Sequence, residues 1–288
     1  MNDYIKRVAS VHDISGFGRC SQTVIIPILS SMGVQVCPLI TSLLSAHTGF
    51  DNYEFVDFTE HIEPFFNHWK KLNIEFDAIY TGFLGSSKQI AIVSKFIDLF
   101  KKENNFVVVD PVFADYGKIY SAFNEDIVIE MRNLIKKADI IVPNITEASF
   151  LLGKPMRTSL SIDEIKEWLL ALSLYGPKIV IITSVGDEND PNVVCNVAYD
   201  RAKKEFIIIK NRLIPCNYTG TGDTFTSVIL GDILQGETLP MSLNKATNFI
   251  VKVIERTYKN GTPPREGIFL EAMLSELSEK VIPSYSFI

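Results

Sequence analysis

Residues 220–230 read Gly220-Thr221-Gly222-Asp223 and then Thr-Phe-Thr-Ser-Val-Ile-Leu, a run of small and apolar residues that predicts a helix. Two glycines leave the backbone N–H groups accessible at the start of that helix, and the helix dipole adds positive potential there. This combination predicts an anion pocket suited to a phosphate. Asp223 repels an anion, so we expect its carboxylate to accept the proton of a hydroxyl that attacks phosphorus.

An Asp-capped helix after a tight turn would use the same four residues, because Asp and Gly are common at both places. The tetrapeptide matches neither Gly-x-Gly-x-x-Gly nor Gly-x-x-x-x-Gly-Lys-Ser/Thr, so no Rossmann or Walker argument applies. The choice between a helix cap and a phosphate site therefore depends on the rest of the chain.

Length and composition indicate one folded α/β unit. A chain of 288 residues suits one large domain better than two, so we expect a single domain over 1–288. Hydrophobic residues make up 47% and charged residues 22% of the chain, as in ordinary folded proteins. The net charge of -6 leaves no basic field for nucleic acid or an anionic membrane, and we expect neither as a partner.

The cysteines Cys20, Cys37, Cys195 and Cys216 are widely scattered, without a Cys-x-x-Cys pair. This spacing predicts neither a zinc site nor a disulfide framework, and reduced thiols fit a cytoplasm. The first residues lack the apolar core of a signal peptide, and no apolar run approaches the roughly 20 residues of a membrane span. We therefore expect a cytoplasmic protein.

Strand-like and helix-like segments alternate through most of the chain. Apolar runs rich in β-branched residues predict buried strands at 7–11, 35–39, 78–81, 106–110, 140–142 and 179–183. Helical spacing predicts helices between them at 23–32, 88–101, 125–137 and 162–175. The alternation predicts right-handed crossovers and a mainly parallel central sheet with helices on both faces.

The C-terminal third follows a different pattern. Segments 192–199 and 205–210 flank a polar turn, which predicts an antiparallel hairpin at the edge of the sheet. Beyond the Asp223 helix we expect a helix from about 241 to 258 and a terminal helix near 268–277.

Polar residues that directly follow predicted strands mark the expected site. In open parallel sheets, ligands bind beyond the carboxyl ends of the strands. Asp110, Asn144 and Glu147 follow two such strands and are the hard ligands that Mg²⁺ prefers, so we expect mostly water-mediated metal contacts. A strand-end turn at Asp110, and a helix cap formed by Asn144 with Glu147, are the structural alternatives.

Five ordered segments of this chain resemble the ribokinase-like superfamily and, within it, the vitamin B6 kinases acting on pyridoxal, pyridoxamine and pyridoxine. These segments are Ser45-Ala46-His47-Thr48-Gly49, Thr81-Gly82-Phe83-Leu84-Gly85-Ser86, Asp110-Pro111-Val112, 138–144 with Glu147, and Gly220-Thr221-Gly222-Asp223. The resemblance implies a three-layer sandwich and transfer of the γ-phosphoryl group of ATP to the 5'-hydroxymethyl group of a B6 vitamer, with Mg²⁺. It also implies a homodimer.

The resemblance assigns roles to residues of this chain. Asp223 would be the base, in an anion hole made by the amides of Gly220, Thr221 and Gly222, and we expect the helix N-terminus to favour its ionised form. Substrate contacts would come from a group of polar residues at the ends of the first two strands, namely Asp13, Thr48 and Gly49, with Ser15 and His47 close by. For His47 alone, a structural histidine is equally open.

Contacts to the nucleotide would come from the ends of the later strands and a helix, namely Asp110, Asn144, Glu147, Thr183, Ser184 and Asn248. Mg²⁺ would lie near Asp110 and Glu147, largely through water. One of Phe17, Phe83 or Phe113 would stack on the substrate ring, and the loop 113–120 would close over the phosphates.

Two alternative functions remain open. Asp13 stands where several well-known B6 kinases have Ser, and Ser15-Gly16 is similar to the start of the hydroxymethylpyrimidine kinases, so such a kinase is the first alternative. A non-catalytic protein that binds B6 vitamers or nucleotide is the second, although it would have little need of a base at Asp223.

Overall fold

The computed structural model describes residues 4–121 and 123–288, and its centre is one sheet of 11 strands. In chain order these strands are β1 (Arg7–Ser15), β2 (Gln35–Leu44), β3 (Phe55–Asp57), β4 (Ala78–Thr81), β5 (Phe106–Val109), β8 (Ile140–Ile141), β9 (Ser159–Leu160), β10 (Ile179–Asp187), β11 (Val193–Asp200), β12 (Glu205–Arg212) and β13 (Ser286–Phe287). A separate ribbon consists of β6 (Ala114–Asp115) and β7 (Lys118–Ile119).

The strand order is β13-β12-β11-β10-β8-β5-β4-β1-β2-β3, with β9 paired to β10. The pairs from β2 through β1, β4, β5 and β8 to β10 are all parallel. At one edge β11, β12 and β13 add antiparallel pairs, and at the other edge β3 pairs antiparallel with β2. The predicted mainly parallel sheet with antiparallel edges is therefore confirmed.

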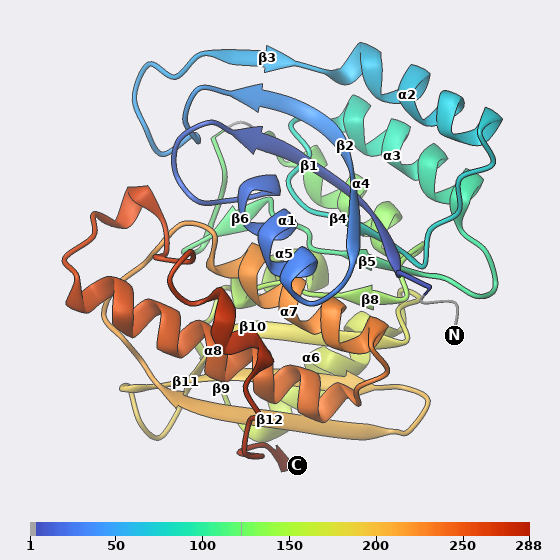
Figure 1. Cartoon of the computed structure of the whole chain (residues 1–288). Coiled ribbons are helices and arrows are strands. Elements are labelled where there is room, and N and C mark those ends of the chain that lie inside the picture. The colour runs from blue at the N-terminus through green and yellow to red at the C-terminus, as the bar shows by residue number, and fades with distance from the viewer. Residues whose placement is uncertain (1–3, 122) are drawn as a thin grey trace.

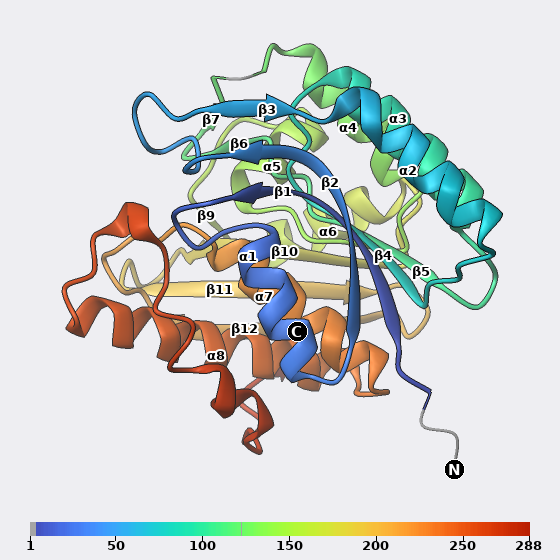
Figure 2. The same ribbon diagram turned by 45° about the horizontal axis from the view of Figure 1, so that its top comes forward.

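Helices cover both faces of the sheet (Figures 1 and 2). One face carries α1 (Gln22–Ser31), α7 (Thr221–Leu234) and α8 (Leu239–Lys259), and the other carries α2 (Thr59–Lys71), α3 (Ser87–Phe100), α4 (Asp126–Ile135), α5 (Ile145–Leu152) and α6 (Ile162–Ser173). Along β1, Val8 packs in the core under the first group while Ala9 and Val11 pack in the core under the second. This alternation follows from the two-residue period of a strand, and it makes the fold a three-layer sandwich.

Several boundaries differ from the sequence prediction. The strands β1, β2 and β10 continue to Ser15, Leu44 and Asp187. Residues beyond each predicted apolar run still pair with the neighbouring strand, β1 with β2 and β10 with β11. Helix α2 was not predicted, since its sequence is mostly polar and contains Pro64.

The predicted terminal helix over 268–277 is wrong. The segment instead makes short turns, with Leu270 N–H donating to the Ile268 carbonyl and Met273 N–H to the Leu270 carbonyl, and ends in a 3-10 turn at Leu274–Ser278. Its apolar residues are buried in the core that α1, α7 and α8 form on their face of the sheet, so their spacing reflects packing of an irregular chain.

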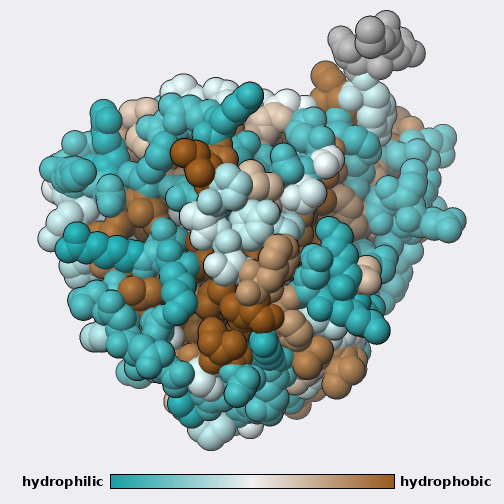
Figure 3. All heavy atoms as spheres, turned by 90° about the horizontal axis from the view of Figure 1, so that it is seen from below, coloured by the Kyte–Doolittle hydropathy of each residue, from teal (hydrophilic) through white to brown (hydrophobic). Residues whose placement is uncertain are grey.

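The molecular surface is mixed in polarity. Figure 3 shows apolar side chains gathered near the centre of one face and bordered by polar ones. Within residues 4–121 and 123–288, each helix is too short or too polar to cross a lipid bilayer.

Candidate active site

Helix α7 begins as the sequence predicted, with Gly220 as its N-cap. Gly220 has a φ of 84°, and a Cβ at this residue would lie 2.1 Å from the Arg19 carbonyl oxygen. Glycine is therefore required here for both backbone conformation and space. The first intrahelical donor is the Thr224 N–H, which bonds the Gly220 carbonyl at 3.0 Å, so the preceding amides of the first turn have no partner within the helix.

Asp223 lies in this first turn, and its side chain is half-buried. Its Oδ2 accepts a hydrogen bond from the Ser21 backbone N–H at 2.8 Å. Burial raises the pKa of Asp223 to about 6, the Ser21 N–H opposes that rise, and the nearby charge of Asp13 adds to it. The expectation that the helix terminus favours the ionised form is thus wrong in direction, because desolvation outweighs it.

Asp110 follows β5 and lies beside the same helix tip. A Cβ built on Gly222 would be 3.9 Å from Asp110 Oδ2, and that oxygen accepts a hydrogen bond from the Thr226 hydroxyl at 3.1 Å. The side chain is buried, and burial together with the charge of Asp223 raises the pKa of Asp110 to about 8. Two carboxyl groups that were predicted to share a site therefore do lie together.

Asn144 and Glu147 form a capping box at the start of α5, as the structural alternative proposed. Glu147 Oε2 accepts from the Asn144 N–H at 2.9 Å, and Oε1 accepts from the Phe113 N–H at 3.1 Å and the Ala114 N–H at 3.5 Å. Burial and the charge of Asp110 raise the pKa of Glu147 well above its ordinary value. Glu147 thus ties the loop after β5 to α5.

The substrate side of the predicted site centres on Asp13, a buried residue of β1. Asp13 accepts hydrogen bonds from the Ser21 hydroxyl at 2.6 Å and the Ser15 hydroxyl at 3.2 Å. Burial raises the pKa of Asp13, and both hydroxyls oppose that rise. Ser21 therefore joins the two carboxylates, with its hydroxyl on Asp13 and its backbone N–H on Asp223.

Sequence analysis did not single out Ser21. It precedes α1, where a serine usually caps the helix, but here its hydroxyl makes no cap bond and its φ is 50°. Strained backbone of this kind is concentrated at functional sites.

His47 is held on both sides of its ring. The Gly49 N–H donates to Nδ1 at 3.0 Å, so Nε2 carries the ring proton and donates to the Arg265 carbonyl at 2.6 Å. With both nitrogens engaged, the histidine anchors its loop to the segment after α8, which fits the structural alternative. Thr48 and Gly49 are exposed beside it.

The predicted nucleotide residues divide into two groups. Thr183 pairs with Asn144 in a parallel bridge, and the exposed Ser184 follows it with a φ of 61°, so both lie beside the start of α5. Asn248 lies on α8 and donates to the Asn244 carbonyl at 2.8 Å and the Ser284 hydroxyl at 3.4 Å, which directs it to the C-terminal segment.

The three aromatic candidates have different environments. Phe113 is fully buried in the core, so the expectation that it could stack on a substrate is wrong. Phe83 is half-buried against Phe123, and Phe17 is 53% exposed with its ring edge-to-face to Phe50.

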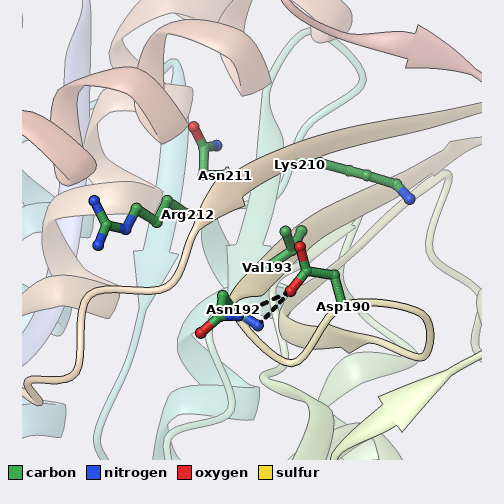
Figure 4. A pocket seen from close by; sticks show the side chains of 6 residues that line it. All are labelled: Asp190, Asn192, Val193, Lys210, Asn211 and Arg212. Carbon is green, nitrogen blue, oxygen red and sulfur yellow. Dashed lines mark hydrogen bonds between the residues drawn. The ribbon is translucent and has the colours of Figure 1, made fainter.

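An open cavity of about 610 Å³ lies where β11 begins and β12 ends, at the edge of the sheet where β10 also ends (Figure 4). It is lined by Asp190, Asn192, Val193, Lys210, Asn211 and Arg212. None of the acidic residues at the tip of α7 lines it, so the cavity and the carboxylate cluster are distinct features.

The buried acids produce a testable dependence of stability on pH. Because the pKa of Asp110 is about 8 in the folded protein and near 4 in an unfolded chain, the free energy of unfolding falls as pH rises from 4 to 8. Asp110→Asn removes the ionisable group and with it this loss of unfolding free energy. In urea unfolding at pH 8, we expect the variant to be more stable than the wild type, with the difference vanishing near pH 4. A less stable variant at pH 8 would contradict the burial argument.

Comparison with known proteins identifies the relatives of this chain. The sequence profile of the phosphomethylpyrimidine kinase family matches residues 28–265. A Bacteroides thetaiotaomicron protein named as a phosphomethylpyrimidine kinase, crystallised with pyridoxal, is 47% identical with a TM-score of 0.96, and the match covers 99% of this chain and 100% of that one.

Two pyridoxal kinases are also similar. The crystal structure of pyridoxal kinase from Lactobacillus plantarum is 29% identical with a TM-score of 0.86, over 95% of this chain and 97% of that chain. Pyridoxal kinase from Dictyostelium discoideum is 28% identical, over 81% of this chain and 80% of its own length. The resemblance to B6 kinases of the ribokinase-like superfamily is confirmed, and the chain belongs to the phosphomethylpyrimidine kinase family.

Proposed function

We propose that this protein transfers the γ-phosphoryl group of ATP to the 5'-hydroxymethyl group of pyridoxal, pyridoxamine or pyridoxine. Family membership makes it a phosphotransferase. The observation that carries the proposal is the position of Asp223, which lies in the first turn of α7 next to unpaired amides and is joined through Ser21 to Asp13. The pyridoxal in the crystals of the 47% identical relative favours a B6 vitamer.

The tip of α7 would bind the transferred group. In a loose transition state, charge is spread over the phosphoryl oxygens, and catalysis depends on positioned positive potential. The amides of Gly220, Thr221 and Gly222 would provide that potential, while Asp223 accepts the proton of the attacking hydroxyl. Its pKa of about 6 leaves it largely ionised at neutral pH and makes it a better base than an exposed Asp.

Mg²⁺ fits this site only with help from phosphate and water. Within the described residues, no three His, Cys, Asp or Glu side chains gather into a metal-binding group. Mg²⁺ commonly uses one or two carboxylates and takes its other ligands from substrate phosphates and water. Asp110 would be the direct ligand and Glu147, whose oxygens already accept three backbone N–H groups, would act through water.

The carboxylates of the site have no cationic side chain as a partner among the described residues. Among the ion pairs within 4–121 and 123–288, none involves Asp13, Asp110, Glu147 or Asp223. Buried charge without a counter-charge is costly, so the site favours a ligand that brings its own positive charge. When bound, Mg²⁺ would neutralise part of the charge on the nucleotide phosphates.

We propose that the B6 vitamer and the nucleotide bind at opposite ends of the sheet edge that the carboxyl ends of the parallel strands form. Asp13 and Ser15 of β1, together with Thr48 and Gly49 in the loop after β2, would contact the pyridine. His47 would hold the loop after β2 in place. Thr183 and Ser184 would bond phosphate or ribose, next to Asn144. Asn248 on α8 would flank the adenine.

We further propose that residues 1–288 act as one kinase domain in the cytoplasm and form a homodimer. The continuous central sheet of 11 strands supports a single domain, and the four free cysteines support a cytoplasmic location. The edge strand β3 exposes Phe55 and Val56 by 48% and 53%, which supports association across that edge. Light scattering should give twice the mass of one chain.

Turnover should fall at acid pH. Because Asp223 must be ionised to accept a proton, and its pKa is about 6, we expect kcat/KM to decrease about tenfold per pH unit below pH 6 and to level off above it. A pH series of initial rates with saturating Mg²⁺ and ATP measures this. A profile that stays flat to pH 5 would remove Asp223 from the role of base.

A hydroxymethylpyrimidine kinase is the alternative, favoured by the family profile and by Asp13. ADP-release assays with pyridoxal, pyridoxamine, pyridoxine and hydroxymethylpyrimidine separate the two. We expect turnover with at least one B6 vitamer. Turnover with hydroxymethylpyrimidine alone would support the alternative, and binding of ligands without ADP release would indicate a non-catalytic protein.

A further inference from the structure

Thr226 differs from the other buried threonines of α7 and α8. In Thr224, Thr247 and Thr257, the hydroxyl donates to the carbonyl of the residue four positions earlier in its own helix. The Thr226 hydroxyl instead leaves α7 and donates to Asp110 Oδ2 at 3.1 Å. Thr226 is fully buried, so this bond joins the helix to the end of β5 inside the core.

This bond fixes one oxygen of a carboxylate and leaves the other free. Among the described residues, Thr226 is the only side chain that donates to Asp110, and none donates to Oδ1. The backbone beneath is fixed as well, because Asp110 N–H donates to the Thr81 carbonyl at 2.9 Å. A carboxylate held at Oδ2 cannot rotate freely, so Oδ1 has a defined direction.

The surroundings offer Asp110 no other anchor. Tyr80 and His12 lie fully buried on the same face of the sheet, with ring centroids 4.4 Å apart, and among the described residues neither side chain donates a hydrogen bond to Asp110. Burial and the charges of Asp110 and Asp223 raise the pKa of Tyr80 well above its ordinary value, and the Thr226 hydroxyl opposes that rise only in part, so Tyr80 is a neutral phenol. The orientation of Asp110 therefore depends on one hydroxyl.

We infer that Thr226 is a positioning residue for Mg²⁺-nucleotide binding: by holding Oδ2 of Asp110, it fixes the orientation of the carboxylate that would bind Mg²⁺ beside the tip of α7. This inference rests on the proposed function, because it assumes that Asp110 binds Mg²⁺ with ATP. It assigns to Thr226 a role in metal affinity and none in the binding of the second substrate.

Thr226→Val keeps the shape of the side chain and removes the donor. We expect the Mg²⁺ concentration for half-maximal rate to rise about tenfold, the size expected for losing one hydrogen bond to a charged group, while the KM for pyridoxal stays unchanged. Thr226→Ser retains the hydroxyl and should return the value to within about twofold of the wild type. A merely structural threonine would not give this separation of the two constants.

A second readout does not depend on turnover. Calorimetric titration of Mg²⁺ into the protein with ADP should show about tenfold weaker binding in Thr226→Val than in the wild type. Ser227→Ala is the matched control, since it removes the neighbouring buried hydroxyl of α7, which has no hydrogen-bond partner among the described residues, and it should change neither Mg²⁺ affinity nor rate. If Thr226→Val does not fold, Thr226→Ala carries the same expectation.

The outcomes distinguish this inference from the proposed function. Wild-type Mg²⁺ affinity in the folded Thr226→Val protein, or failure of Thr226→Ser to restore it, overturns the role of Thr226. Absence of turnover in the wild type with every substrate overturns the proposed function, while the titration with ADP still decides the role of Thr226.

Discussion

Asp223→Asn should lower kcat by about 10²- to 10⁴-fold, the usual contribution of a general base, and leave ATP binding almost intact. Asparagine has the size of aspartate but cannot accept the proton of the attacking hydroxyl. It also keeps an oxygen that can accept the Ser21 N–H, so the local structure should survive. Initial rates of ADP release give kcat, and calorimetry gives the ATP dissociation constant.

Asp232→Asn is a matched control on the same helix. Asp232 is a second aspartate of α7; it is buried and pairs with Lys245 at 2.8 Å near the C-terminal end of the helix. We expect this variant to lose some stability and to keep its turnover. An Asp223→Asn protein with a near-normal rate, or an equal loss of rate in both variants, would contradict the role given to Asp223.

Gly220→Ala should abolish most of the activity and destabilise the fold. Its Cβ would lie 2.1 Å from the Arg19 carbonyl oxygen, so the backbone on one side must move, and with it the amides at the tip of α7. Loss of one well-placed donor to a transition-state oxyanion lowers kcat by about 10²- to 10³-fold, and we expect at least this effect. Overpacking adds about 1–3 kcal/mol to the cost of the positive φ.

Gly236→Ala isolates the backbone cost. Gly236 has a φ of 89°, close to the 84° of Gly220, but a Cβ there meets nothing within 4 Å. This variant should lose about 1–2 kcal/mol of unfolding free energy from the positive φ alone and retain full turnover. Urea unfolding and initial rates on both variants make the comparison. Equal losses of stability and rate at the two glycines would show that the contact with Arg19 is unimportant.

Much of the fold was predictable because it depends on local patterns. The buried strands are short, apolar and β-branched, and β4 was predicted with its bounds as found, since all of 78–81 is buried. The grouping of polar residues at the carboxyl ends of the strands was predictable for a related reason. In a parallel sheet the carboxyl ends of strands must meet at one edge, so Asp110 and Asn144 had to lie near each other.

The remaining features depend on contacts between distant parts of the chain. Ser21 and Asp223 are 202 positions apart, and nothing in the sequence around either residue predicts their hydrogen bond. The same holds for His47 and Arg265, 218 positions apart, whose bond gives His47 its structural role. Burial is also a property of the whole fold, which is why Phe113 was mistaken for an accessible aromatic residue and why the pKa of Asp223 was expected to shift the other way.

The most direct test of the central claim is to follow the γ-phosphoryl group itself. Phosphorus NMR of wild-type protein with Mg²⁺, ATP and pyridoxal should show the loss of the γ-phosphate resonance and the appearance of a phosphate monoester on the 5'-oxygen of pyridoxal. The same mixture with Asp223→Asn should show almost none over the same time. Intact pyridoxal in the wild-type reaction, with the phosphate appearing only on water or only on hydroxymethylpyrimidine when that is supplied, would contradict the proposed function.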